Sequence, residues 1–204
     1  MKKIIILTII LLAISIEGFT QYVKIGSQVW SSKNLNVSKF RNGDPIPQAL
    51  SAEDWERASS NGEPAWCYYD NDPKNGPKYG KLYNWYAVND PRGLAPAGWH
   101  IPSENEWRIL INFIGASAGT KLKSNQGWFN NGNGTNSAGF SALPGGYRYS
   151  YGSFLNIEEN GNWWTSTETG NSSAWQRVMN CRSSTVVTFD GIKGSGQSVR
   201  CIKN

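Results

Sequence analysis

The sequence predicts an α+β domain, in which helices pack on one side of a twisted, mostly antiparallel sheet. Helical spacing of apolar residues marks two segments between positions 82 and 114. After position 160, short aromatic and β-branched runs alternate with Gly, Asn and Ser, which is typical of strands and turns. The chain has 204 residues, 39% of them hydrophobic, and a mean hydropathy of −0.49. These values suit a single domain with its own core and exclude both a multi-span membrane protein and a disordered chain.

The composition is unusual in its aromatic content. Ten Trp, nine Tyr and seven Phe accompany 22 Gly. So much ring area beside so much glycine indicates a loop-rich fold whose core is filled by large flat side chains. The only histidine, His100, excludes a multi-His zinc site and leaves any Ser-His-Asp scheme with one possible base.

Residues 1–20 are typical of a secretory signal peptide. Lys2 and Lys3 supply the positive start, and the apolar run Ile4–Ile16 is too short to span a bilayer comfortably. The residues just before position 21 form a poor cleavage site, so an uncleaved N-terminal anchor is the alternative. We expect residues 21–204 to be one exported domain, periplasmic, held at the outer surface or released, that does not insert into a membrane once the signal is removed.

The charge is mildly basic and dispersed. Without residues 1–20, the 20 basic and 15 acidic residues fall to 18 and 14, a net charge of +4. The basic residues form no run of five or more. Nucleic-acid binding requires a concentrated stripe of positive charge, so we expect no nucleic-acid partner.

The first half of the mature chain predicts a hairpin, a helix and a strand. Residues 22–30 are predicted to form a small hairpin that turns at Gly26. A short helix over 51–57 begins at Ser51, which has an acidic residue three positions later. A strand is expected over 65–69.

Two further helices have clearer patterns. In the first, over 82–88, Leu82, Trp85 and Tyr86 share one face. The second covers 103–114 and opens with a Ser103–Glu106 capping box. Its apolar face consists of Trp107, Leu110, Ile111 and Ile114. Gly115 is expected to end the helix.

The C-terminal part is expected to be β-rich after a long loop. Residues 124–139 are rich in Asn and Gly and predict that loop. The predicted strands that follow it are 163–167, 173–179, 185–189 and 198–202.

Several motifs are similar to those of a known family. They are Tyr79–Val88, Gly93–Ser103 with Glu106-Trp107, Gly139–Arg148 and Trp163–Glu168. Together they resemble the Fibrobacter succinogenes major paralogous domain, a family common in secreted proteins of Bacteroidetes and Fibrobacteres. The resemblance covers nearly the whole mature chain.

The resemblance implies a C-type-lectin-like fold, in the wider group that includes the formylglycine-generating enzyme and sulfatase-modifying domains. Such a fold packs two main helices against a twisted, mostly antiparallel sheet with long irregular loops. The paired catalytic cysteines of the oxidase members have no counterpart in this sequence, and neither do the calcium motifs of sugar-binding lectins. The resemblance therefore implies a fold without an active site.

Three cysteines, Cys67, Cys181 and Cys201, remain in the mature chain. In an oxidising compartment two of them would be expected to pair, and their spacing leaves all three pairings open. The resemblance favours a Cys67–Cys201 disulfide, because the family often carries cysteine at both positions. Cys181–Cys201 is the rival pairing.

Two polar features could carry a ligand or a reaction. Asp70, Asp72 and Asn75 offer oxygen ligands within six residues, which suits calcium, although an Asx-rich turn explains the same pattern. His100 precedes a helix start, and we expect it to be a structural imidazole bonded to backbone, with no role as a base. No other cofactor is expected.

An exposed aromatic strip is the predicted binding surface. Trp163 and Trp164 are adjacent, so in a strand one ring points inward and the other, taken here as Trp164, points to the opposite face. Tyr147, Tyr149 and Tyr151 share one face at a period of two. Two more tryptophans, Trp55 and Trp128, are also left free for a partner.

The leading hypothesis for function is an exported, non-catalytic domain that binds a cell-surface or extracellular glycan or protein. It rests on the resemblance, the signal sequence and the lack of any convergent catalytic set. One alternative is an enzyme of the sulfatase-modifying kind centred on a redox-active Cys181. The other is a purely structural envelope protein without a specific ligand.

Overall fold

A computed structural model describes residues 21–204 of the chain, so the predicted signal peptide lies outside the described residues. The architecture is mixed helix and sheet, and all but one of the strand pairings within its sheets are antiparallel. The α+β prediction is therefore confirmed at the level of class. No helix among residues 21–204 is both long enough and apolar enough to cross a membrane.

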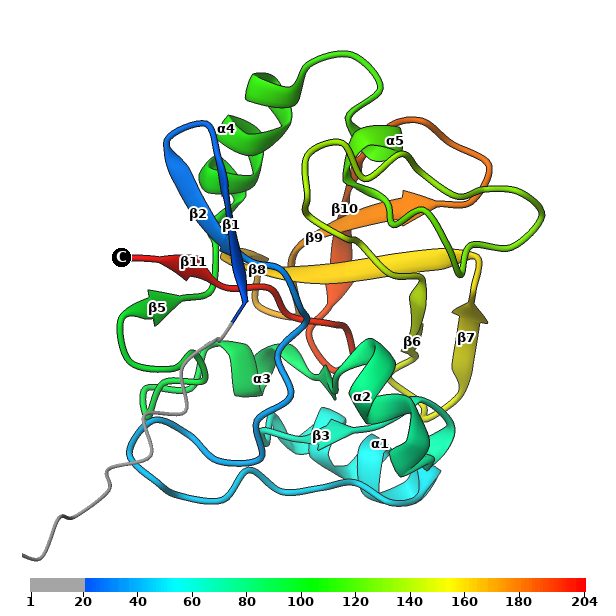
Figure 1. The fold of residues 1–204 in the computed structure, drawn as a ribbon. Helices are drawn as coiled ribbons and strands as arrows, with labels where there is room; N and C mark the ends of the chain where they lie inside the picture. The colour runs from blue at the N-terminus through cyan, green and yellow to red at the C-terminus, as the bar shows by residue number, and fades with distance from the viewer. Residues whose placement is uncertain (1–20) are drawn as a thin grey trace, which may run out of the picture.

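A four-stranded sheet joins the two ends of the described chain (Figure 1). Its strands, in spatial order, are β1 (Tyr22–Ile25), β2 (Gln28–Ser31), β11 (Ile202–Lys203) and β5 (Trp99–His100). The predicted hairpin is β1–β2, and it turns at Gly26. The φ of Gly26 is +61°, a left-handed value that other L-residues rarely adopt.

The larger sheet has five strands and forms the centre of the molecule. In spatial order they are β10 (Val187–Ile192), β9 (Ser173–Asn180), β8 (Asn160–Gly170), β6 (Gly145–Arg148) and β7 (Phe154–Ile157). Only β6 and β8 run parallel. A third, two-stranded sheet pairs β3 (Trp66–Cys67) with β4 (Leu82–Tyr83).

The helices flank these sheets (Figure 1). They are α1 (Ala52–Asn61), α2 (Gly76–Tyr79), α3 (Trp85–Val88), α4 (Glu104–Ile114) and α5 (Ala118–Leu122), with 3₁₀ turns at Tyr69–Asn71 and Pro73–Asn75. The capping box predicted for α4 is present in full between Ser103 and Glu106. Ser51 caps α1 as expected, and Gly62 ends that helix in the left-handed conformation.

Some predicted elements have different bounds. Leu82 is not helical, because Leu82 and Tyr83 pair with β3 before Asn84 caps α3. The strand expected over 65–69 is limited to Trp66–Cys67, after which the chain enters a 3₁₀ turn. Of the predicted strand 198–202, only Ile202 lies in a strand, which is β11. Residues 198–201 instead cross between the sheets.

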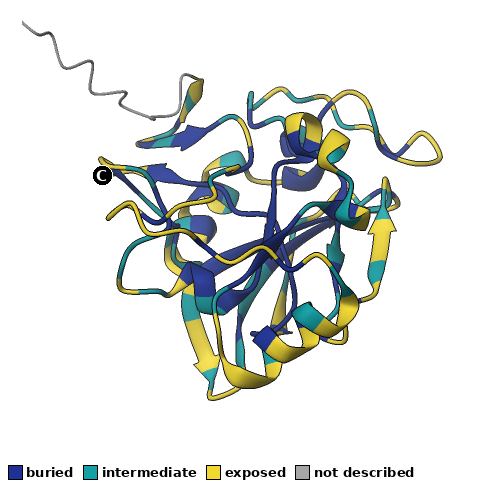
Figure 2. Cartoon of the chain, turned by 90° about the horizontal axis from the view of Figure 1, so that it is seen from below, coloured by how far each residue is buried: buried dark blue, intermediate teal, exposed yellow. Residues whose placement is uncertain are grey.

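The core consists of three hydrophobic clusters, and nine of the ten tryptophans are buried in them. Figure 2 shows the buried strands in the middle of the molecule and the exposed segments around them. The partly accessible tryptophan is Trp175 in β9. The prediction that Trp55 and Trp128 are free for a partner is wrong, because both rings are buried and donate their indole N–H groups to internal oxygens.

Candidate functional site

Trp164 is not an exposed platform. It is 0% exposed, and its indole nitrogen donates to the Tyr83 carbonyl oxygen at 2.9 Å. Trp163 and Trp164 do point to opposite faces of β8, as the period of two requires, but a separate core cluster covers each face. Because a core cluster covers each face of β8, neither ring reaches solvent.

The three predicted tyrosines do not form one continuous strip. Strand β6 ends at Arg148, and a turn closes as the Tyr149 amide donates to the Ser153 carbonyl at 2.7 Å. Tyr151 lies in that turn, 67% exposed, with its ring centroid 5.4 Å from that of Tyr149. The structure nevertheless brings Tyr147 and Tyr149 together at the mouth of one cavity.

This cavity lies on one face of the larger sheet and has a volume of about 300 Å³. Its floor comes from alternating positions of β8 and β9, where Asn162 is paired with Val178 and Trp164 with Gln176. The segment after β10 closes one side. We call it the tyrosine–amide cavity, after Tyr147, Tyr149, Asn162, Gln176 and Gln197.

Two side-chain amides in the cavity wall have unsatisfied oxygens. Asn162 is 5% exposed and Gln197 is 2% exposed, and the amide oxygen of each has no hydrogen-bond partner among the described residues. The Asn162 side-chain nitrogen donates to the Gln176 amide oxygen at 3.3 Å, so only the nitrogen of the Asn162 amide is hydrogen-bonded. Gln197 is fixed by its backbone, which exchanges two hydrogen bonds with Tyr83. A buried carbonyl without a donor costs about 1–3 kcal/mol, so a hydrogen-bond donor that reached either oxygen would remove that cost.

The remaining polar groups of the cavity are mostly neutral. Burial, with a smaller contribution from Tyr149, raises the pKa of Tyr147, so its hydroxyl stays protonated at neutral pH. One carboxylate, Asp190 of β10, lies at the rim and accepts a hydrogen bond from Thr169. The cavity can therefore both donate and accept hydrogen bonds beside aromatic rings.

Sequence reasoning missed the amides of this site. The usable signal was the alternation of Asn160 and Asn162 with apolar residues at the start of β8, which places polar side chains on one face of an otherwise hydrophobic strand. No sequence pattern indicated Gln197. It reaches the cavity only because its segment pairs with Tyr83 and runs beside Arg148.

The predicted calcium ligands have turn-forming roles in the structure. The Asp72 carboxylate accepts from the Lys74 amide at 2.9 Å, which is the Asx turn offered as the alternative. The Asn75 amide donates to the Tyr69 carbonyl at 2.9 Å, and Asp70 has a left-handed φ of 53°. Within residues 21–204, no group of three or more His, Cys, Asp or Glu side chains is placed to hold a metal ion. Calcium binding by Asp70, Asp72 and Asn75 stays a prediction.

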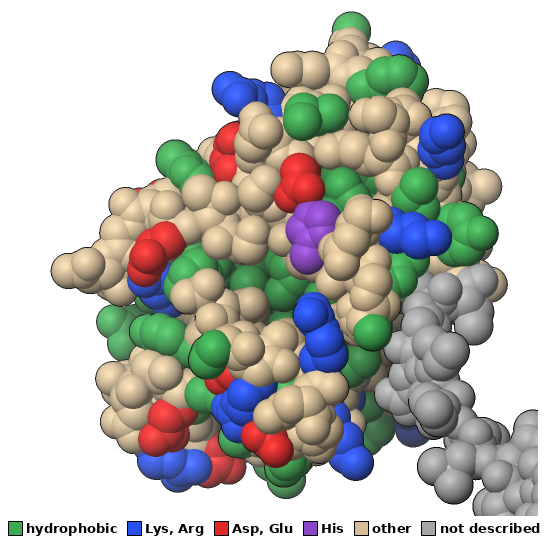
Figure 3. Space-filling model, turned by 90° about the vertical axis from the view of Figure 1, so that its left-hand side faces the viewer, with side chains coloured by type: hydrophobic (Ala, Val, Ile, Leu, Met, Phe, Trp, Pro, Cys, Tyr) green, Lys and Arg blue, Asp and Glu red, His purple; other side chains and the backbone are tan. Residues whose placement is uncertain are grey.

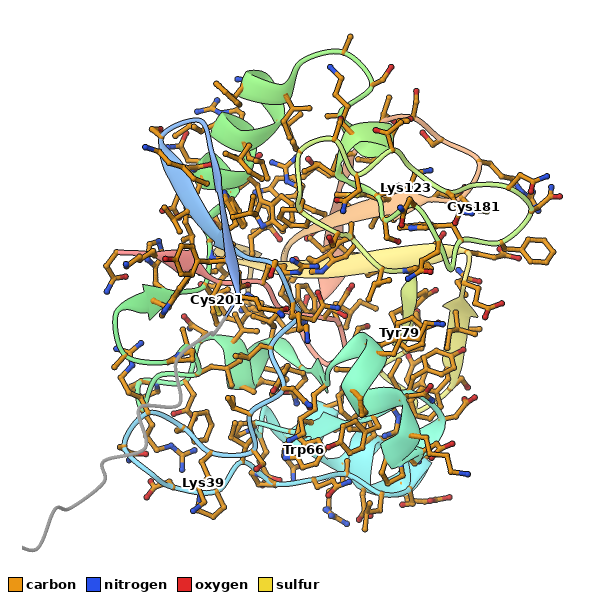
Figure 4. The ribbon with its side chains drawn as sticks, viewed as in Figure 1. Lys39, Trp66, Tyr79, Lys123, Cys181 and Cys201 are labelled. Carbon is orange, nitrogen blue, oxygen red and sulfur yellow. The ribbon has the colours of Figure 1, made fainter. Side chains whose placement is uncertain are left out.

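The Cys67–Cys201 disulfide is not formed, and that prediction is corrected: all three cysteines are free and buried. Each lies in a different core cluster, so no two thiols share one packing neighbourhood. Figure 4 shows Cys181 beside Lys123 and far from Cys201, so the rival pairing is not formed either. Burial raises the pKa of Cys67 to about 12, which keeps that thiol protonated.

His100 lies at the surface between two side chains, where Figure 3 shows it in purple beside a carboxylate. Its Nε2 is 2.7 Å from Glu106 Oε1, and its Nδ1 is 2.7 Å from Asn204 Oδ1. The prediction that the imidazole bonds to a backbone group is therefore wrong. The imidazole instead links the first turn of α4 to the end of the chain.

No curated protein matches the chain. The family model described as the Fibrobacter succinogenes major domain matches residues 23–203. That match runs from the second residue of β1 to the last residue of β11. The chain therefore belongs to the Fibrobacter succinogenes major domain family.

Proposed function

We propose that the chain is an exported, non-catalytic binding domain that holds a sugar residue of a glycan in the tyrosine–amide cavity. The observation that carries this proposal is the pair of buried amide oxygens, on Asn162 and Gln197, that lack hydrogen-bond donors. A bound hydroxyl group would supply such a donor and remove the cost of leaving the carbonyl unpaired.

The other cavity groups suit the same class of ligand. A pyranose presents apolar C–H faces and a ring of hydroxyl groups, which matches the aromatic and amide side chains together. The rings of Tyr147 and Tyr149 offer apolar contact without an unpaired charge, and Asp190 offers a further acceptor. The cavity volume of about 300 Å³ is at the lower end of the range for ligand sites, as expected for one sugar residue.

Export and the finer fold assignment belong to the same proposal. The predicted signal sequence would deliver the domain to a compartment where glycans are displayed. A C-type-lectin-like fold is supported by α1 and α4 flanking mostly antiparallel sheets, and by the long loop of residues 124–139 that precedes β6. The alternative of an enzyme built on Cys181 requires an accessible thiol, whereas this side chain is buried.

A glycan array probed with the full chain tests this function. Neutral glycans are expected to bind, and the tightest of them is then titrated against variants by calorimetry. Tyr149→Ala is expected to weaken binding at least tenfold. Gln197→Met is expected to do the same while leaving the free energy of unfolding unchanged or higher, because it removes an unsatisfied buried oxygen.

The matched control is Tyr22→Ala, which removes a 63%-exposed tyrosine that does not line the cavity. It should leave glycan affinity unchanged. Unaltered glycan binding by both Tyr149→Ala and Gln197→Met would overturn the assignment of the site. An array on which no glycan binds, with binding only to a protein partner, would overturn the ligand class.

A further inference from the structure

A second and larger hollow is formed by three segments far apart in the sequence. They are the stretch after β2, helix α2 with the glycine that follows it, and the long loop after α5, which lie around the centre of Figure 1. The hollow has a volume of about 870 Å³, and none of its lining residues belongs to the tyrosine–amide cavity. We call it the lysine groove, after Lys33 and Lys78 in its wall.

The charge at the surface of the lysine groove has one sign only. Lys33 and Lys78 are both exposed, and neither forms an ion pair within residues 21–204. No aspartate or glutamate belongs to the described lining. A hollow lined by one sign of charge concentrates field lines and attracts ligands of the opposite sign.

A third positive charge lies beneath the floor. Arg200 is 1% exposed, and its Nε donates to Asn34 Oδ1 at 2.7 Å, while a terminal nitrogen donates to the Ser141 carbonyl at 2.9 Å. Asn34 and Ser141 both line the groove. The hydrogen-bond acceptors of this guanidinium among residues 21–204 are all neutral oxygens, so no carboxylate in that part of the chain neutralises it. Burial lowers the pKa of Arg200 to about 9, which leaves the group charged at neutral pH.

The groove also presents unused hydrogen-bonding groups. The side chains of Asn36, Asn125 and Gln126 are exposed in its wall and make no hydrogen bond to another described residue. Amides can donate to carboxylate or sulfate oxygens and accept from hydroxyl groups. No aromatic side chain lines the groove, so it lacks the stacking platforms on which single-stranded nucleic acids are held.

We propose that the lysine groove is a second binding site, which takes an acidic oligosaccharide bearing carboxylate or sulfate groups. Lys33 and Lys78 attract the acidic groups, and Asn36, Asn125 and Gln126 contact the sugar hydroxyls. This site is independent of the tyrosine–amide cavity, which has a different lining and no lysine or arginine in its wall. The chain would then hold a neutral sugar at one surface and an acidic glycan segment at another.

Titration of the full chain with tetragalacturonate at low ionic strength tests this site, with a sulfated tetrasaccharide as the second probe and neutral maltotetraose as the control. We expect the acidic probes to bind, with affinity that falls as salt is added, and maltotetraose not to compete. The double variant Lys33→Gln/Lys78→Gln is expected to weaken binding of the acidic probes at least tenfold.

The matched control is Lys39→Gln/Lys74→Gln, which makes the same change in net charge at two exposed lysines outside the groove. It should leave the affinity within twofold. An equal loss in both double variants would show a general effect of net charge and overturn the site. Equal affinity for an oligothymidylate of matched charge, or no binding of either acidic probe at low salt, would also overturn it.

A variant of the tyrosine–amide cavity tests whether the two sites are separate. Tyr149→Ala should leave tetragalacturonate binding unchanged, since Tyr149 does not line the lysine groove. A loss of acidic binding in that variant would mean that the acidic ligand occupies the tyrosine–amide cavity, and it would overturn the second site.

Discussion

Arg148 shows how a single buried charge connects segments that are distant in the sequence. The side chain is fully buried, and its guanidinium donates to the carbonyl oxygens of Gly152, Ala49 and Ser51 at 3.0, 3.2 and 2.7 Å. It also lies over the ring of Trp55, 4.8 Å from the centroid. One residue therefore ties the end of β6 to the start of α1, because a guanidinium can donate in several directions at once.

Arg148→Lys is expected to lower the free energy of unfolding by about 2–4 kcal/mol, since an ammonium group cannot reach three divergent carbonyls and leaves buried acceptors unpaired. Urea unfolding followed by tryptophan fluorescence measures the change. Arg57→Lys, at an exposed arginine of α1 paired with Asp54, is the control and should have no measurable effect. Equal losses in the two variants would contradict the role of Arg148.

Burial of Lys81 is expected to make the free energy of unfolding depend on pH. Its ammonium group lies 3.8 Å from the Trp66 ring centroid, and burial of the side chain lowers its pKa from 10.5 to about 8. Between these values the unfolded chain still holds a proton that the folded chain has lost. The free energy of unfolding should therefore gain a positive contribution as pH rises from about 8 toward 10.5.

Urea unfolding at several pH values tests this contribution by comparison with Lys81→Met. The variant keeps the aliphatic contact with Trp66 and removes the titrating group. Across that pH range, the free energy of unfolding of the parent chain should rise relative to that of the variant. Parallel curves would show that Lys81 does not titrate differently in the folded chain.

At the scale of elements, the start of α4 depends on Glu106. Its carboxylate accepts from the Ser103 amide at 2.8 Å, and its other oxygen contacts His100. Burial raises the pKa of Glu106, but hydrogen bonds from the Ser103 backbone and from His100 outweigh that effect, so its pKa is lower than the usual 4.5. The ionised form therefore stabilises the fold above pH 4.5, and that stabilisation is lost as pH falls through the lowered value.

Glu106→Gln is expected to reduce the free energy of unfolding at pH 7 by about 1 kcal/mol, because an amide accepts these bonds more weakly than a carboxylate does. Below pH 4.5 the variant and the parent chain should converge. Thermal unfolding from pH 3 to pH 7 measures this. A difference that stays constant over the whole range would contradict the assigned role of the carboxylate.

Local patterns predicted elements well where the residues that decide them are close in the sequence. The Ser103–Glu106 capping box and the Gly26 turn depend on neighbours within a few positions, and both are present. Leu82 had the spacing of a helix but lies in a strand, because pairing with Cys67 satisfies its backbone. Tyr149 and Tyr151 alternated like strand residues but lie in a turn that closes onto Ser153.

At the scale of the whole molecule, burial decides the chemistry of the cysteines. Cys67, Cys181 and Cys201 occupy three separate core clusters. Burial raises the pKa of both Cys67 and Cys201, so these two thiols are protonated and shielded from reagents. The unpaired thiols therefore contribute to packing as small apolar groups.

Mass analysis of the non-reduced chain should find three free thiols. An alkylating reagent should label them slowly in the native chain and completely in 6 M guanidinium chloride. A peptide in which two of the cysteines are linked would contradict the unpaired arrangement. Rapid native labelling of Cys181 alone would restore the hypothesis of a reactive thiol there.

The sequence alone determined the class of the fold, the family, the hairpin, the best-capped helix and the rich supply of aromatic side chains. Each of these follows from short-range pattern or from extended motifs. Only the tertiary structure decided which rings are accessible. Trp164 follows the strand alternation as expected, yet it is buried because core clusters cover both faces of β8. Asn162 and Gln197, whose amide oxygens lack donors, line one cavity for the same reason: long-range packing, which no local pattern encodes, brings their segments together.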